Sequence, residues 1–175
     1  QTAYSDSLGR VTQVVHRDLF STTAITESTA YDFRDLVVET TTSRATTTYS
    51  YDFLGRLLTV TYPNTADPMT ITYDDLNRIR TVVAENGRKS GYLQDVGGRT
   101  TSVREYIDAS TFYVTVMSYD EEANLLHVEN ALNQVTSHEY DNLNRVTRST
   151  FADGTYEQYT YDEVGNLVTH RNRMG

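Results

Sequence analysis

The sequence of 175 residues predicts an all-β protein: an array of about eight antiparallel β-hairpins that together form one long, twisted and curved sheet. Three observations support this fold class. A Tyr-Asp motif recurs about every 21 residues, apolar and polar residues alternate with a period of two, and turn-forming residues follow at regular distances. A repeat of this length is typical of an array of like supersecondary units. We therefore expect a single repeat domain over residues 1–175.

The Tyr-Asp motif leads each time into a turn and then into a short apolar strand. The clear copies begin at Tyr51, Tyr73, Tyr140 and Tyr161, and two degraded copies begin at Tyr31 and Tyr119. Two further copies, Tyr4 to Arg10 and Tyr92 to Arg99, are interpreted as carrying insertions between the tyrosine and the aspartate. The motif residues that we expect to build the turns are Tyr31, Asp32, Tyr51, Asp52, Gly55, Arg56, Tyr73, Asp74, Asn77, Arg78, Tyr119, Asp120, Tyr140, Asp141, Asn144, Arg145, Tyr161, Asp162 and Gly165.

Each residue type in the motif has a physical reason to stand where it does. The Asp carboxylate can accept hydrogen bonds from backbone amides just ahead of it, and Gly or Asn four positions after the tyrosine suits a left-handed backbone. Asp35 and Ala123 stand at that position in the two degraded copies, so the sequence leaves the geometry of those two turns open.

The alternation between the motifs predicts strands. Met69, Ile71 and Tyr73 share one face of an extended segment, and the intervening threonines share the other. Asn86-Gly87 and Asp153-Gly154 predict two-residue hairpin turns at the opposite end of each unit. A single hairpin is only marginally stable, so we expect about sixteen strands that stack on their neighbours along the sheet.

Composition excludes several classes of function. The net charge of −9 and the isoelectric point near 4.8 argue against a nucleic-acid-binding surface, which needs clustered Lys and Arg. No apolar run is long enough to span a membrane, and no cysteine is present for disulfides or thiolate metal sites. The chain begins without a signal peptide and within a repeat, so we expect it to be a fragment of a longer polypeptide.

The motif of residues 51–57, Tyr-Asp-Phe-Leu-Gly-Arg-Leu, and its relatives from Tyr73 and Tyr140 resemble the YD repeat, also called the RHS repeat. This repeat occurs in bacterial polymorphic toxins, the C component of insecticidal toxin complexes, wall-associated proteins and teneurins. The resemblance extends from Tyr4 to the C-terminus. It implies a strip of hairpins that spirals into a hollow β-shell, of which this chain would form an arc. In toxin members the shell encloses a toxin domain, and in teneurins it is a scaffold for adhesion.

The resemblance also implies a location and partners: a secreted or cell-surface protein whose partners are the adjoining repeats of the same polypeptide and either an enclosed cargo domain or a cell-surface glycan or protein. The Asp-Pro-x-Gly signatures of the protease-like region in bacterial members are absent. Asp67-Pro68 is the one Asp-Pro pair, and it lacks the residues that should follow. We therefore assign no self-cleavage to this segment.

Acidic clusters and a pair of histidines are candidate functional sites that could also have structural roles. The acidic residues at Asp120-Glu121-Glu122 and Asp74-Asp75 raise the alternatives of calcium binding and paired-carboxylate catalysis. The first Asp recurs without a second acid, as at Asp52, which favours a turn cap. His127 and His138 could be cross-strand neighbours, but they lack a third zinc ligand. We expect no catalytic residue, no metal, no cofactor and no enzyme activity.

The remaining predictions concern arginine and tyrosine. Each arginine just after a turn is predicted to pair with an aspartate of an adjacent turn, which would form a ladder of charges along one rim; these arginines are Arg10, Arg56, Arg78, Arg99 and Arg145. The tyrosines are expected to pack on adjacent repeats. The alternative is a carbohydrate-stacking platform that uses Tyr62, Tyr106, Tyr113 or Tyr156. The sequence thus predicts a non-catalytic wall segment, with a carbohydrate- or surface-binding module as the alternative.

Overall fold

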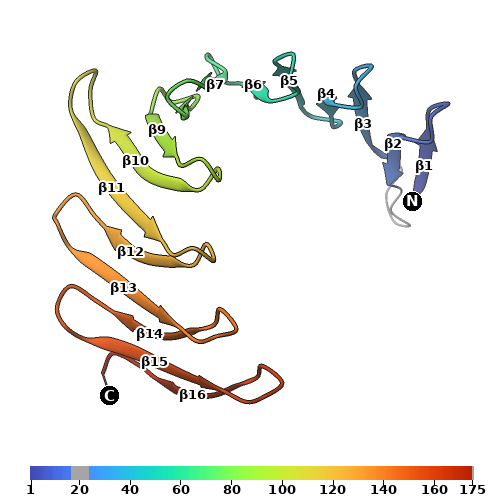
Figure 1. The fold of residues 1–175 in the computed structure, drawn as a ribbon. Coiled ribbons are helices and arrows are strands. Elements are labelled where there is room, and N and C mark those ends of the chain that lie inside the picture. Colours follow the sequence, from blue (N-terminus) through green and yellow to red (C-terminus); the bar gives the residue numbers. More distant parts are fainter. Residues whose placement is uncertain (17–23, 175) are drawn as a thin grey trace. The chain divides into compact units, whose positions relative to one another are not determined.

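The computed structural model describes residues 1–16 and 24–174. Within these residues the chain forms sixteen β-strands, arranged in one antiparallel sheet in the order in which they occur in the sequence (Figure 1). This arrangement confirms the predicted all-β array of antiparallel hairpins. By its contacts the chain divides into two units, Gln1–Thr72 with Thr81–Arg88, and Tyr73–Arg80 with Lys89–Gly175. Each unit is described by itself.

The first unit contains β1 (Thr2–Ser5), β2 (Val11–His16), β3 (Ile25–Tyr31), β4 (Val37–Thr41), β5 (Thr46–Tyr51) and β6 (Leu57–Thr61). The residues of β7 (Met69–Asp74) and β8 (Ile79–Val83) are divided between the two units. The second unit continues with β9 (Lys89–Gln94), β10 (Thr100–Tyr106), β11 (Phe112–Tyr119), β12 (Leu125–Glu129), β13 (Val135–Tyr140), β14 (Val146–Thr150), β15 (Tyr156–Tyr161) and β16 (Leu167–Arg171).

A β-bulge follows the Tyr-Asp turns and repeats along the sheet. Between β5 and β6, Tyr51 lies opposite Leu57 and Ser50 lies opposite Thr59, so Leu58 is an extra residue. The same shift occurs between β3 and β4, β11 and β12, β13 and β14, and β15 and β16. A bulge places two residues opposite one and re-aims the side chains next to it. It therefore explains why two neighbouring leucines, both partly buried, begin β6.

The loops after β8 and β14 use the same backbone geometry as the Tyr-Asp turn. In the loop after β8, the Ala84 amide donates to the Arg88 carbonyl and the Gly87 amide donates to the Ala84 carbonyl. Gly87 has a φ of 79°, whereas Asn86 is not among the residues with positive φ. The predicted two-residue turns at Asn86-Gly87 and Asp153-Gly154 are therefore wrong. Both are three-residue loops that end in a left-handed glycine.

Within each unit the sheet is a single layer with few buried side chains. Among the described residues, Val60 and Ile71 are the buried apolar side chains, at 4% and 9% exposure, and Ser149 is the buried polar one. Most folded domains bury one face of a sheet against a second layer of structure. Here the stabilising contacts run sideways from strand to strand, as in other repeat proteins.

Candidate functional site

The Tyr-Asp turn is the chemically distinctive unit of the chain, and Asp52 shows how it is built. One carboxylate oxygen of Asp52 accepts the backbone amides of Leu54 and Arg56, each at 2.9 Å. Its second oxygen accepts the Nε–H of Arg56 at 2.7 Å. The Asp52 amide donates to the Arg56 carbonyl at 2.9 Å, and the Gly55 amide donates to the Asp52 carbonyl at 3.1 Å. The aspartate is therefore a cap that satisfies the donors of its own loop.

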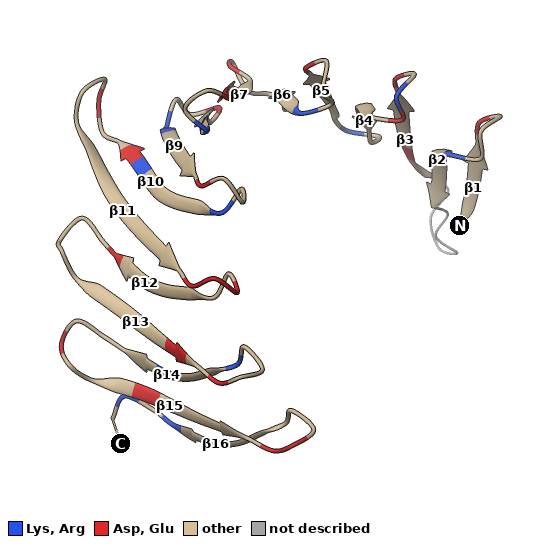
Figure 2. Cartoon of the chain, viewed as in Figure 1, with Lys and Arg blue, Asp and Glu red and all other residues tan. Residues whose placement is uncertain are grey.

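The same pattern recurs in both units, and Figure 2 shows acidic residues at these loops. Asp6, Asp95 and Asp141 each accept the amide and the Nε–H of the arginine four positions on. The repetition supports the turn-cap interpretation of the motif aspartates.

The left-handed position of the turn falls where the sequence predicts it in most copies. Gly55, Asn144 and Gly165 have φ values of 81°, 59° and 92°. Asp35 and Ala123, whose turns the sequence left open, adopt φ values of 65° and 70° and keep the same turn hydrogen bond. These two non-glycine residues therefore hold an unfavourable conformation that the surrounding turn imposes.

The turn after β7 departs from the prediction. The positive φ of 55° falls on Arg78, not on Asn77. Asn77 instead donates its backbone amide and its side-chain amide to the two carboxylate oxygens of Asp74, at 3.0 and 2.8 Å. The Nε–H of Arg78 donates to the Gln94 carbonyl at 3.1 Å. With the turn one residue longer, Asn77 takes the capping contact that arginine makes elsewhere.

The motif tyrosines link each repeat to the one before it. The hydroxyl of Tyr51 donates to the Val37 carbonyl at 2.7 Å, and that of Tyr140 donates to the Leu125 carbonyl at 2.9 Å. Tyr31, Tyr119 and Tyr161 make the equivalent bond to Val11, Thr100 and Val146. The acceptor is always the first residue of the strand that follows a turn, next to the bulge. The tyrosine hydroxyl therefore satisfies a carbonyl beside the irregular part of the ladder.

The motif arginines also reach the next repeat, but not as predicted. Arg56, Arg99 and Arg145 form an ion pair with the aspartate of their own turn. The second contact of Arg99 and Arg145 is the backbone carbonyl of the next motif aspartate. Arg99 donates to the Asp120 carbonyl at 3.0 Å, and Arg145 donates to the Asp162 carbonyl at 3.2 Å. The predicted pairing between adjacent turns occurs at Arg10, which contacts both Asp6 and Asp35. The planar guanidinium suits this role because it offers several donors in fixed directions.

The same guanidinium groups lie over the tyrosine rings of the following repeat. The guanidinium carbon lies 4.8 Å from the Tyr31 ring centre for Arg10, 5.1 Å from Tyr119 for Arg99, and 4.6 Å from Tyr161 for Arg145. These distances are in the range of a cation–π interaction. Tyrosine, aspartate and arginine of the motif thus form one unit that joins consecutive turns.

Two features of the turns were missed from the sequence. In the turn of Asp32 the arginine stands two positions after the aspartate, yet Arg34 makes the same ion pair and donates to the next carbonyl, of Asp52, at 2.7 Å. Asn124 and Asn166 stand at the arginine position and donate their amides to Asp120 and Asp162. A motif with a fixed distance of four residues between aspartate and arginine does not identify Arg34, which stands only two residues after Asp32.

The predicted insertions at Tyr4 and Tyr92 are also wrong. Ser5 pairs with Val11, and Gln94 pairs with Thr100, as the motif tyrosine does elsewhere. Serine and glutamine therefore occupy the tyrosine position at these two turns, with no extra residue in the chain.

Replacing Arg99 by alanine is expected to lower the melting temperature, because the change removes the ion pair with Asp95, the bond to the Asp120 carbonyl and the contact with Tyr119. The Arg99→Lys variant should have a melting temperature close to that of the alanine variant. Lysine keeps the charge but cannot bond both Asp95 and the Asp120 carbonyl at once. Circular dichroism melts measure the effect. Arg88→Ala, at an exposed loop position, is the control. Equal melts for the alanine variants at 99 and 88 would contradict the linking role.

Hydrogen bonding lowers the pKa of the turn carboxyls. The side chain of Arg145 lowers the pKa of Asp141 below 3.8, and the side chain of Asn166 does the same for Asp162. At the loop after β10, the backbone amides of Ser110 and Thr111 lower the pKa of Asp108 to about 2. Each of these groups takes up protons more readily in the unfolded chain than in the folded one.

We therefore expect the contribution of these aspartates to stability to be complete above about pH 4 and to fall as the pH drops through their lowered pKa values. His138 adds a smaller loss below its ordinary pKa of 6.5, because burial and then His127 lower its pKa. Urea unfolding between pH 7 and pH 2.5 measures both steps. His138→Gln should remove the upper step alone. A flat profile from pH 5 to pH 2.5 would contradict the capping role of the aspartates.

His127 and His138, considered from the sequence as a zinc pair, do not lie directly opposite one another. His127 lies opposite Ser137, and the Nδ1 atom of His138 lies 2.9 Å from the Ser149 hydroxyl. Over residues 1–16 and 24–174, no group of three or more His, Cys, Asp or Glu side chains could hold a metal ion. In the same ranges the structure has no helix that is both long and apolar enough for a transmembrane span.

The four tyrosines considered for carbohydrate stacking differ in their surroundings. Tyr156 lies under the guanidinium groups of Arg148 and Arg171. Tyr106 packs against Phe112, with ring centres 5.4 Å apart, and against Lys89. Tyr62 and Tyr113 remain open to solvent, at 38% and 56% exposure.

Comparisons with known proteins agree with this repeat geometry. A family model described as RHS Repeat matches residues 119–156 and 140–173, which contain the turns of Asp120, Asp141 and Asp162. No curated protein matches the sequence. The solved TcdB2–TccC3 structure superposes with a TM-score of 0.75 at 17% identity, and the Photorhabdus luminescens Tc holotoxin pore with 0.74 at 18%. The complex TcdB2–TccC3–Cdc42 gives 0.73 at 17%.

In each case the match covers 94% of this chain and 10% of the other, so the chain spans about a tenth of the length of these structures. At this level of identity the likeness concerns the fold. The family match lies over the last three turns, and the same cap, bulge and tyrosine bond occur together in the turns of Asp32 and Asp52. The family model therefore identifies RHS repeats, also called YD repeats, over residues 119–173.

Proposed function

We propose that this chain is a non-catalytic part of the wall of a β-shell that encloses or displays another domain, such as a toxin. The observation that carries the proposal is the single layer of the sheet, in which Val60 and Ile71 are the buried apolar side chains among the described residues. An isolated domain normally covers its sheet with a second layer. A shell wall has no such need, because its stability comes from lateral contacts and its inner face meets a cargo.

Two further observations support this function. The fold is shared with TccC3-containing structures, one of which is a toxin-complex pore. The motif residues are also engaged in holding turns together: their carboxylates, guanidinium groups and hydroxyls bond to the backbone and to one another. These contacts give the motif side chains a structural role in the turns, which argues against a catalytic role for them.

Under this proposal the partners are the adjoining repeats of the same polypeptide and the enclosed domain, and the protein is secreted or lies at a cell surface. Neither nucleic-acid binding nor membrane insertion forms part of the function. The net charge of −9 is consistent with the first of these statements.

Protease protection tests the wall. In the polypeptide that contains this array and its adjoining domain, protease sites placed in that domain should resist cleavage while the shell is intact. The same domain expressed alone is the matched control and should be cut rapidly. Weakening the links between repeats, by Tyr119→Ala with Tyr140→Ala, should make the enclosed sites accessible. Equal cleavage of the enclosed and the isolated domain would disprove encapsulation.

The second candidate is a carbohydrate- or surface-binding module. It is favoured by the exposed ring of Tyr113, and by Tyr62 to a smaller extent, because aromatic faces can stack on sugars. A glycan array followed by calorimetry distinguishes the two functions. Saturable binding that is lost in Tyr113→Ala supports the module, and absence of binding supports the wall.

A further inference from the structure

The turn of residues 119–125 differs in charge from its neighbours at three positions. Asn124 stands where Arg99 and Arg145 stand in the preceding and following turns. Glu122 stands at the tip, where the turns of Asp141 and Asp162 carry the exposed apolar side chains Leu143 and Val164, and Glu121 precedes it. One change removes a positive charge, and the other two each add a negative charge. The turn of Asp120 is therefore more negative by three charges than the turns of Asp95 and Asp141.

The arginine that is replaced has a fixed place in the other turns. Its guanidinium bonds the carboxylate of its own aspartate, donates to the carbonyl of the next motif aspartate, and lies over the next motif tyrosine. Arg10, Arg99 and Arg145 each make all three contacts. The space between two successive turns is thus a guanidinium site that the chain normally fills by itself.

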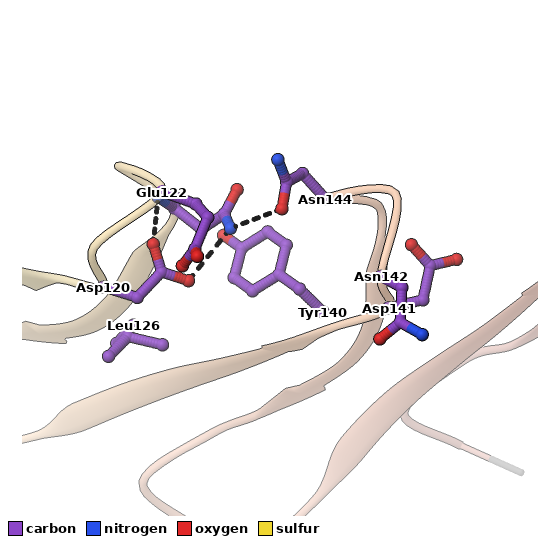
Figure 3. Close-up of a pocket in the computed structure, with 8 residues that line it drawn as sticks. Asp120, Glu122, Leu126, Tyr140, Asp141, Asn142 and Asn144 are labelled. Carbon is purple, nitrogen blue, oxygen red and sulfur yellow. Dashed lines mark hydrogen bonds between the residues drawn. The ribbon is translucent and has the colours of Figure 1, made fainter.

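At Asn124 that space is a cavity of about 500 Å³. The shorter amide bonds Asp120 at 2.9 Å and Asn144 at 3.0 Å. Figure 3 shows the Tyr140 ring between Asp120 and Glu122 on one side and Asn144 on the other. The residues that line the cavity are Asp120, Glu122, Asn124, Leu126, Tyr140, Asp141, Asn142 and Asn144.

We propose that this cavity binds a guanidinium group, supplied by an arginine side chain of a polypeptide that packs against this rim. The carboxylates of Asp120 and Glu122 would accept its N–H groups, the Asp141 carbonyl would accept a third, and its plane would lie on the Tyr140 ring. These are the contacts that Arg99 makes with Asp95, with the Asp120 carbonyl and with Tyr119. Glu122 adds an acceptor that the turns with arginine lack.

The lining favours a guanidinium over other cations. Over the described residues, no cluster of acids and histidines fits a metal ion. A lysine ammonium is a compact charge without the planar fork, so it cannot bond two turns and lie flat on a ring at once. The proposal is independent of the shell function, because it depends on the missing arginine alone.

Binding of capped arginine, N-acetyl-L-arginine methylamide, tests the proposal by nuclear magnetic resonance on the whole chain. We expect saturable shifts of the Asn124 and Asn144 side-chain amides and of Tyr140, with a dissociation constant of about millimolar, as for weak charged contacts near the surface. Capped lysine should bind at least about fivefold more weakly. Absence of saturable shifts, or equal binding of the two probes, would overturn the proposal.

Asn124→Arg restores the usual residue and should fill the cavity from within the chain, so that capped arginine binds at least about tenfold more weakly. Asn166→Arg is the matched control, because Asn166 caps Asp162 in the same way but does not line the cavity. This variant should bind like the natural chain. Glu122→Leu restores the apolar tip and should weaken binding without loss of the fold. Undiminished binding by Asn124→Arg would also refute the proposal.

Discussion

Replacing Tyr51 by alanine is expected to lower the free energy of unfolding by about 3 kcal/mol, because it removes a large, partly buried ring and its hydrogen bond. The Tyr51 hydroxyl donates to the Val37 carbonyl at 2.7 Å, across the boundary between two repeats. Burial raises the pKa of this tyrosine, which agrees with a hydroxyl held away from water. Urea unfolding, followed by circular dichroism, measures the change in midpoint.

Tyr51→Phe separates the two contributions of this side chain. Phenylalanine keeps the ring and loses the hydroxyl, so it should cost about 1 kcal/mol, the value of one hydrogen bond whose acceptor is left unpaired. Tyr62→Phe is the control, since Tyr62 is exposed at the end of a hairpin and is not a motif tyrosine. If Tyr51→Phe behaves like Tyr62→Phe, the hydroxyl does not link the repeats.

The fold could be predicted from the sequence because every repeat carries the same information. Period-two alternation, as in Met69 to Tyr73, marks strands, and a motif about every 21 residues marks their boundaries. Consecutive strands joined by short loops must pair with their neighbours, so the strand order follows directly. Local sequence signals and lateral packing favour the same structure. The predicted number and order of strands therefore agree with those in the structure.

The sequence could not show which partner each motif residue takes. The arginines were expected to pair with the carboxylates of adjacent turns, whereas Arg99 pairs with Asp95 and reaches a backbone carbonyl. A three-residue loop brings together an aspartate and an arginine that are four residues apart. The arginine therefore pairs with the aspartate of its own turn. The carbonyl beside the bulge can be identified as an acceptor only when the register of the strands is known. The sequence gives no signal for the extra residue of the bulge, Leu58.

The loop geometry was misjudged for a related reason. Asn86-Gly87 is a strong signal for a two-residue turn when it is taken alone. In the structure it belongs to a three-residue loop with Gly87 as the left-handed residue, as at Gly55 in the Tyr-Asp turn. A dipeptide therefore marks the position of a turn better than it marks the number of residues in it.

Replacing Ala123 by glycine is expected to raise the free energy of unfolding by about 1 kcal/mol. Ala123 has a φ of 70°, in the left-handed region where a side chain costs about 1–2 kcal/mol. Glycine removes this cost, although it also gives the unfolded chain more freedom, which offsets part of the gain. Chemical unfolding of the whole chain measures the shift, which should appear as a higher midpoint with an unchanged slope.

The reverse change at Gly98 is the matched control in the same unit. Gly98 has a φ of 81°, and a Cβ atom there would meet no other atom within 4 Å, so any cost of Gly98→Ala comes from the backbone alone. That cost should be about 1 kcal/mol, equal in size and opposite in sign to the gain at Ala123. Because the two residues hold equivalent positions in two successive turns, the double variant should have nearly the stability of the natural chain. A loss of stability on Ala123→Gly would mean that the alanine side chain makes a contact worth more than its strained backbone.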